Sequence, residues 1–154
     1  MPVNDVVVDT NVFMHAENKV EARRDACAKF VEKLLADDTH LCVDEGFDLL
    51  ESDNRSQIGG EYLRFLRPGS IGYHVVTYLA LNQRVNNVSR AVPANVGRQI
   101  TRLIYDPTDR VFVKVAFNSR SQVFVSHDFA NFPNRVRAQL HGNLGIETLE
   151  AIEI

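Results

Sequence analysis

Several features that would assign this chain to a class are missing from it. No apolar run has the length of a membrane span, and the N-terminus, MPVNDVVV, lacks the basic segment of a signal peptide. The two cysteines, Cys27 and Cys42, show no CxxC spacing, and the five histidines include no HxxxH pair. We therefore expect no membrane association, a cytoplasmic location, and two reduced, buried cysteines.

A strong charge of either sign is missing as well. The formal net charge is −3, so no global field attracts nucleic acid. The basic residues are mostly arginine, which binds phosphate through two parallel hydrogen bonds, so a local basic patch is an alternative to plain solvated charge. The chain has 154 residues, 45% of them hydrophobic, and shows no repeat or linker, which predicts a single domain over 1–154.

Short apolar strands alternate with helical segments along the chain. The first, within VVVDTNVF at 6–13, is a β-branched run that ends in Asp9, and a later apolar strand ends just before Ser126-His127-Asp128. Strand, helix and strand in succession make a crossover unit, so the pattern predicts an α/β fold with a parallel sheet. The expected strands are 6–8, 40–43, 122–125 and 146–149. The expected helices are 11–17, 20–36, 61–67, 72–84, 96–105 and 134–141, the last ending at a Gly142 cap.

The segment from Asp106 to residue 117 fits two structures. Alternating valines at 111, 113 and 115 favour a strand, whereas Asp106-Pro107-Thr108-Asp109 is a good helix start, with Asp106 as the cap. We predict a helix, because the segment lies just before a strand in an alternating α/β pattern. Residues 46–60 are expected to be irregular, and 86–94 receive no assignment.

Acidic residues stand at the ends of several expected elements. Asp9 and Asp128 follow strands, and Asp109 and Glu61 stand near helix starts. Each of them alone also fits a turn, a helix cap or solvated surface. Together at the carboxyl edge of a parallel sheet they would form a site. Converging carboxylates repel one another unless a hard cation such as Mg²⁺ or Mn²⁺ neutralises them, and such a cation can activate water for phosphodiester hydrolysis.

Three segments, VVVDTNVF, DPTDRVFVKVAF and VFVSHDF, resemble a PIN domain, a family that includes toxins of VapC type. The resemblance implies a three-layer α/β/α sandwich around a parallel sheet. It implies that Asp9, Asp109 and Asp128 share one or two Mg²⁺ or Mn²⁺ ions and that the protein is an endoribonuclease for single-stranded RNA. It also implies a toxin of a toxin–antitoxin pair, with an antitoxin protein and a second copy of the chain as partners.

The family pattern has one more acidic position, in a middle helix. Glu61, within IGGEYLRFL, is the first choice for that position, both as a catalytic residue and as a metal ligand. Glu51, Asp44 and Glu45 are the alternatives, and Asp44 competes because it follows an expected strand.

Neighbours of these acids are candidates for supporting roles. We expect Thr10 or Asn11 to hold Asp9 by hydrogen bonds and Ser126 to do the same at the second strand tip. Arg110 is the first choice for contacting a substrate phosphate. His127 is expected to be a partly exposed histidine at a strand tip rather than a functional group.

Two other functions compete with the nuclease. One is a non-catalytic PIN-like domain that binds RNA or protein. A metal titration would distinguish this domain from the nuclease. The other is a phosphatase with an aspartyl nucleophile, because VVVDTN also resembles a haloacid-dehalogenase motif. That chemistry needs a second acid two residues after the nucleophile, where this chain has Asn11.

Overall fold

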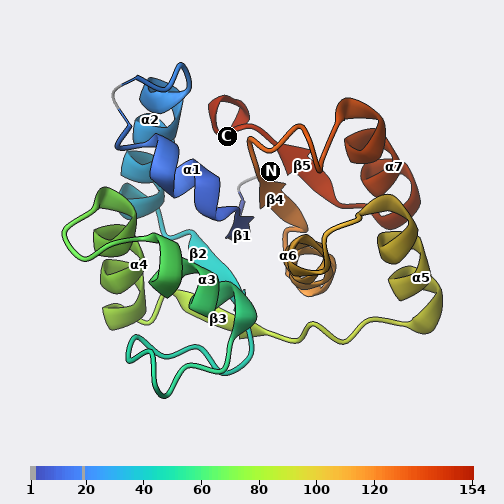
Figure 1. Cartoon of the computed structure of the whole chain (residues 1–154), viewed down its shortest axis with the longest axis horizontal. Helices are drawn as coiled ribbons and strands as arrows, with labels where there is room; N and C mark the ends of the chain where they lie inside the picture. Colours follow the sequence, from blue (N-terminus) through green and yellow to red (C-terminus); the bar gives the residue numbers. More distant parts are fainter. Residues whose placement is uncertain (1–2, 19) are drawn as a thin grey trace.

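The core of the protein is a five-stranded sheet in which all neighbouring strands are parallel (Figure 1). The computed structural model describes residues 3–18 and 20–154. The spatial order of the strands is β3-β2-β1-β4-β5, which confirms the predicted α/β fold with a parallel sheet. The strands are β1 Asp5–Val8, β2 His40–Asp44, β3 Val85–Val88, β4 Val123–Val125 and β5 Glu147–Leu149.

Helices cover both faces of this sheet and complete a three-layer α/β/α sandwich. In Figure 1, α1 to α4 lie on one side of the strands and α5 to α7 on the other. The helices are α1 Thr10–His15, α2 Arg24–Ala36, α3 Gln57–Phe65, α4 Ile71–Leu81, α5 Ala94–Leu103, α6 Pro107–Asn118 and α7 Asn134–Leu144, and a 3₁₀ turn, η1, spans Ala151–Glu153.

The strand order creates a switch point between β1 and β4. From β1 the chain moves outward through β2 to β3, and it then returns to add β4 and β5 on the other side of β1. In open α/β sheets, ligands bind at such a point, outside the carboxyl ends of the strands. Asp9 follows β1 and Ser126-His127-Asp128 follow β4, so the topology places both aspartates there.

Burial explains why the apolar runs of the two central strands, 6–8 in β1 and 123–125 in β4, are unbroken. All four residues of β1 and all three of β4 are buried, because helices cover both faces of the sheet.

Burial also explains the ambiguous pattern at 106–117. Helix α6 contacts β1, β2 and β4, and its residues Val111, Phe112, Val113, Val115 and Ala116 are all buried. The predicted helix is confirmed, and the valine alternation belongs to a helix that is apolar around most of its circumference.

Helix α3 begins at Gln57, inside the segment expected to be irregular. Asp44 stabilises this start, since its carboxylate accepts hydrogen bonds from Ser56 Oγ (2.6 Å) and from the backbone N–H groups of Gln57 and Ile58 (2.8 Å each). Gly59 lies in the first turn, where an added Cβ would come within 2.3 Å of the Phe47 ring. The glycine at position 59 is therefore favoured by tertiary packing, which local helix propensity does not report.

Other boundaries differ from the predictions for similar reasons. α2 begins at Arg24 instead of residue 20, and α4 ends at Leu81 instead of residue 84. Strand β3, with the sequence VNNV, was missed because it is a sheet edge without an apolar alternation. The cap of α7 is Gly145, at φ +71°, and the prediction of Gly142 was wrong.

Across the described ranges 3–18 and 20–154, none of the helices combines the length and the apolar character that crossing a membrane demands.

Candidate functional site

Asp9 lies at the carboxyl end of β1 and is only 8% exposed. Its backbone N–H donates to Val125 of β4 (2.9 Å), which joins the two strand tips. Its Oδ2 accepts a hydrogen bond from Ser126 Oγ (2.8 Å), and the same hydroxyl oxygen accepts the N–H of Asp128 (3.1 Å). Ser126 therefore positions Asp9, which belongs to the neighbouring strand. The sequence had predicted that Ser126 would support the tip of its own strand, β4.

Glu61 approaches the same edge from the middle of α3. Its Oε2 accepts a hydrogen bond from Thr10 Oγ1 at 3.0 Å, so Thr10 holds Glu61 and not Asp9. The next residue, Tyr62, is buried and donates its hydroxyl proton to the carbonyl of Val8 in β1. The Tyr62 ring also meets Phe13 edge to face, with centroids 5.5 Å apart. These contacts fix α3 against β1 and place Glu61 beside the strand tip.

Asp109 lies in the first turn of α6, where Asp106 is the cap and accepts the N–H of Thr108 (2.8 Å). The Oδ2 atom of Asp109 is buried and has no hydrogen-bond partner within the part of the chain that the structure describes. A buried carboxylate oxygen without a donor is costly unless a cation or water satisfies it.

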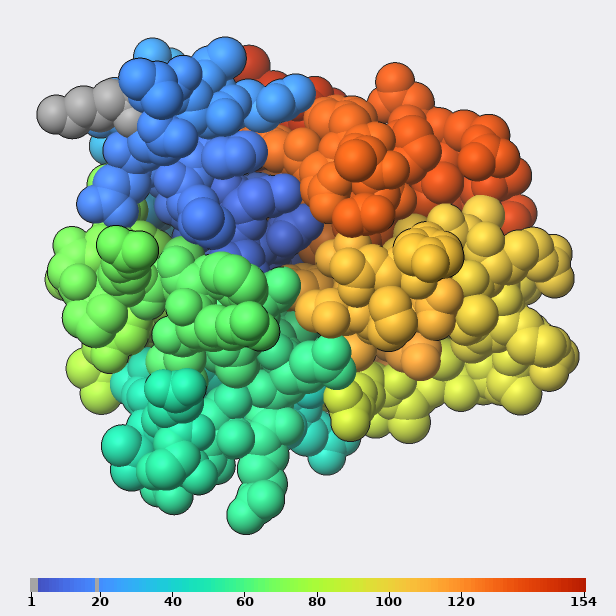
Figure 2. All heavy atoms as spheres, in the orientation of Figure 1, coloured from blue at the N-terminus to red at the C-terminus, as the bar shows by residue number. Residues whose placement is uncertain are grey.

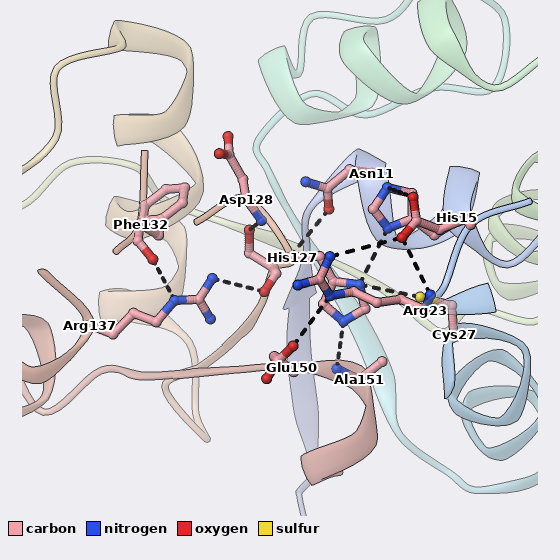
Figure 3. A network of polar contacts seen from close by, with 12 residues as sticks. Asn11, His15, Arg23, Cys27, His127, Asp128, Phe132, Arg137, Glu150 and Ala151 are labelled. Carbon is pink, nitrogen blue, oxygen red and sulfur yellow. Dashed lines mark hydrogen bonds and ion pairs between the residues drawn. The ribbon is translucent and has the colours of Figure 1, made fainter. Parts of the chain in front are cut away.

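Asp128 follows β4 and forms a tight turn with the residues after it. Its carboxylate accepts the backbone N–H groups of Ala130 (3.1 Å) and Asn131 (3.0 Å) and the side-chain amide of Asn131 (2.9 Å). Behind this turn the buried Arg137 donates to the carbonyls of Phe132 (2.6 Å) and Ser126 (3.0 Å), as Figure 3 shows. The turn holds Asp128 at a fixed place beside Asp9.

The four carboxylates lie close enough to act on one another's ionisation. Burial, together with the charges of Glu61 and Asp128, raises the pKa of Asp9 to about 6, although the hydrogen bond from Ser126 acts in the opposite direction. Burial and then the charges of Asp9, Asp106, Asp128 and Glu61 raise the pKa of Asp109 to about 7. Burial also raises the pKa of Glu61, with Asp106 adding to the effect. The edge is thus an acidic site that resists ionisation.

The side chains at this edge offer carboxylate oxygens, the ligands that a hard divalent cation prefers. Over residues 3–18 and 20–154, no three of these carboxylates have oxygens within 4.8 Å of one another, so the side chains as they stand do not enclose one ion. Mg²⁺ and Mn²⁺ keep several waters and need only one or two carboxylates as direct ligands. The unpartnered Oδ2 of Asp109 and the raised pKa values of Asp9 and Asp109 are the features that a cation would relieve.

The alternatives for the middle acid lie elsewhere. Asp44 is 2% exposed, and its carboxylate caps α3. Glu45 and Glu51 are exposed residues of the segment between β2 and α3. Of the four candidates, Glu61 is the one whose charge acts on both Asp9 and Asp109.

Two other predicted residues contact backbone groups. Arg110 donates from Nε to the carbonyl of Ile104 (2.7 Å) and from Nη2 to that of Tyr105 (3.0 Å), so its guanidinium braces the turn between α5 and α6. Asn11 accepts the N–H of His127 at 3.5 Å. Neither side chain makes a hydrogen bond to Asp9.

The structure also brings together residues that sequence reasoning left apart. His15, Cys27 and His127 have ligand atoms within 4.8 Å of one another, and they are the one group of its kind in the described part of the chain. They come from α1, from α2 and from the tip of β4, so no spacing motif marks them. His127 is 6% exposed, which corrects the expectation of a partly exposed histidine.

Comparisons of the chain with protein-family models, with curated proteins and with solved structures find no match.

Proposed function

We propose that this protein is a metal-dependent nuclease of PIN type that hydrolyses phosphodiester bonds in single-stranded RNA. One observation carries the proposal. Carboxylates from β1, α3, α6 and the β4 tip lie at the switch point, where burial and neighbouring negative charges raise the pKa values of Asp9 and Asp109. Figure 2 shows the atoms of these segments meeting near the centre of one face. A cluster of this kind stores repulsion that a bound divalent cation would release.

The residues at this site would have different roles. Asp9, Glu61, Asp109 and Asp128 would hold Mg²⁺ or Mn²⁺. When bound, such a cation supplies activation of the attacking water and neutralises charge that develops on the phosphate. Ser126 and Thr10 orient Asp9 and Glu61 through single hydrogen bonds, which hold the two carboxylates at this edge of the sheet before an ion binds.

An RNA strand has a suitable surface next to the acidic site. Arg98 and Arg102 lie one turn apart on α5 and line a groove between α5 and α7. The other polar residues of that groove are amides, and no carboxylate lines it. Tyr105 follows α5 and is 90% exposed, directly before Asp106. Two arginines that could contact phosphates and an exposed ring that could stack on bases thus follow α5 toward the acids. This arrangement favours a single-stranded nucleic acid.

Replacing both arginines tests this surface. The double variant Arg98→Ala/Arg102→Ala should weaken binding of a short single-stranded RNA about tenfold and lower the slope of log K against log salt by about 1.4, because two phosphate contacts are lost. The measurement is a fluorescence-anisotropy titration in EDTA at three salt concentrations. Lys29→Ala/Arg120→Ala removes the same charge from exposed residues elsewhere and is the control. Equal losses for the two double variants would contradict a specific RNA surface on α5.

The activity itself is tested with a labelled single-stranded RNA of mixed sequence. We expect cleavage in Mn²⁺ or Mg²⁺, none in excess EDTA, and recovery when metal is restored. A duplex of the same sequence should be cleaved more slowly, since its bases are not free to stack. Metal binding without cleavage of any RNA would favour the non-catalytic alternative, and absence of metal binding would refute the site.

The phosphatase alternative has less support from the geometry. The position two residues after Asp9 is Asn11, an amide that lies beside the His127 N–H and not an acid that could protonate a leaving group. Hydrolysis of a generic phosphate monoester by the wild type would favour this alternative over the nuclease. An antitoxin partner and a homodimer remain predictions that depend on the resemblance alone.

A further inference from the structure

Three side chains with metal-binding atoms meet on the other side of Asn11 from Asp128. Figure 3 shows His15 at the end of α1, Cys27 in α2 and His127 after β4 pointing toward one another. Nδ1 of His127 lies 3.4 Å from Nδ1 of His15 and 3.5 Å from Sγ of Cys27. His127 Nδ1 is thus the common neighbour of a nitrogen and a sulfur.

These two separations match edges of a tetrahedral coordination shell, and the ligand atoms of the remaining pair, His15 and Cys27, lie within 4.8 Å of each other. With Zn–N near 2.0–2.1 Å and Zn–S near 2.3 Å, ligand atoms around one ion lie about 3.3–3.6 Å apart. Cys27 is fully buried and His127 nearly so, while His15 is half-buried and offers the route from solvent. Imidazole and thiolate ligands are those that Zn²⁺ prefers, and they are poor ligands for Mg²⁺ or Mn²⁺.

We propose that His15, Cys27 and His127 form a second metal site, for Zn²⁺ or a divalent ion of similar softness. Three protein ligands leave a fourth position for water or another small ligand. This proposal does not depend on the nuclease proposal, because it involves none of the four carboxylates.

The surroundings of His15 orient it for this role. The Glu21 carboxylate lies 3.7 Å from Nε2 of His15 and favours the tautomer with the proton on Nε2. The lone pair is then on Nδ1, which faces the other two ligands. A carboxylate behind a ligating histidine is a common arrangement in zinc sites. Burial lowers the pKa of His15, which favours the neutral ring that a metal ion needs as a ligand.

His127 requires a proton to move. In the structure its Nε2 accepts the backbone N–H of Ala151 at 3.0 Å, so in the neutral ring the proton is on Nδ1. Coordination through Nδ1 shifts that proton to Nε2, where it faces the Ala151 N–H, and this contact must open. Cys27 loses its thiol proton to solvent as the metal–sulfur bond forms. Each ion bound therefore releases one proton and frees the start of η1 from His127.

Cobalt gives a direct spectroscopic test on the full chain. Adding one equivalent of Co²⁺ to the metal-free wild type should produce the visible bands of tetrahedral Co²⁺ and a thiolate-to-cobalt charge-transfer band in the near ultraviolet. One equivalent of Zn²⁺ should remove both. Saturating Zn²⁺ should also increase hydrogen exchange at the Ala151 amide, because its acceptor is lost.

Matched variants assign the ligands. Cys27→Ser should abolish the charge-transfer band, whereas Cys42→Ala, which removes the other buried cysteine, should keep it. His127→Gln should weaken Co²⁺ binding at least tenfold, whereas His141→Gln, at an exposed position, should leave it unchanged. Repeating the titration in Asp9→Asn excludes binding by the carboxylates, since the bands should persist. Absence of the charge-transfer band in the wild type, its survival in Cys27→Ser, or unchanged exchange at Ala151 would overturn the proposal.

Discussion

Asp9→Asn should reduce metal-dependent RNA cleavage by about 10³-fold while leaving the protein folded. Asp9 is the most buried carboxylate of the site, and its backbone N–H and its carboxylate both form hydrogen bonds with the tip of β4. An asparagine keeps an oxygen that can accept the Ser126 hydroxyl, so the local geometry survives. It removes the negative charge that a divalent cation needs, and metal affinity and rate should fall together.

The control for this experiment also decides which residue is the middle acid. Glu51→Gln removes an exposed carboxylate between β2 and α3 and should retain wild-type activity, whereas Glu61→Gln should lose at least about tenfold. Single-turnover cleavage of the same labelled RNA, at saturating Mn²⁺ and over a Mn²⁺ series, separates weaker metal binding from slower chemistry. Wild-type rates for Asp9→Asn would contradict the site, and loss of activity in Glu51→Gln alone would move the middle acid away from α3.

The parts of the site that the sequence predicts are those set by neighbours along the chain. An apolar β-branched run followed by an aspartate determines both the strand and the position of Asp9 at its end, and the same holds for Asp128 after β4. Asp106-Pro107 fixes the start of α6 and thereby the place of Asp109. Because parallel strands end at one edge of a sheet, these local features also predict that the three aspartates share an edge.

The parts that escaped prediction depend on contacts between distant segments. The start of α3 depends on a carboxylate from β2, thirteen residues before Gln57 along the chain. Strand β3 pairs through its backbone with β2 and carries little apolar signal in its own sequence. His15, Cys27 and His127 have no common spacing, and only the packing of α1, α2 and the β4 tip brings them together.

The hydrogen bonds of Thr10 and Ser126 were also only partly predictable from the sequence. The sequence indicated that small hydroxyl residues beside the acids would orient them, and both do so. Each orients an acid from another element, Glu61 in α3 for Thr10 and Asp9 of β1 for Ser126. Because each hydroxyl binds an acid of another element, the two hydrogen bonds connect the tips of β1 and β4 with α3. Such connections keep a site built from separated segments rigid.

Burial of the acids and the repulsion between them should also appear as a pH-dependent loss of stability. Asp9 and Asp109 have pKa values of about 6 and about 7 in the folded protein, raised from 3.8 mainly by burial. The folded state therefore holds protons that the unfolded chain has released. The stabilisation from these protons is complete below about pH 4 and disappears as the pH rises through 6 to 7, so the free energy of unfolding should fall over that interval.

The Asp9→Asn variant has no ionisable group at position 9, so at high pH it should be the more stable of the two proteins. In EDTA at pH 8 it should be more stable than the wild type by about 1–3 kcal/mol, since each unit of pKa shift corresponds to about 1.4 kcal/mol. At pH 4 the advantage should be small, because Asp9 is then protonated in the folded state and, with an unfolded pKa of 3.8, close to half protonated in the unfolded state. Urea denaturation of both proteins at pH 4, 6 and 8 measures the difference, and Asp25→Asn, which removes an exposed carboxylate of α2, should keep the wild-type profile.

Metal connects this stability difference with function. Saturating Mn²⁺ at pH 8 should stabilise the wild type through preferential binding to the folded state and leave Asp9→Asn nearly unchanged, so the gap between them should close. A constant difference between the two proteins at all three pH values, with or without Mn²⁺, would mean that the folded protein does not raise the pKa of Asp9. If the gap opens with pH and closes with metal, the cost of holding four acids at one sheet edge is what the cation removes, and the acidity of the site is an adaptation to binding it.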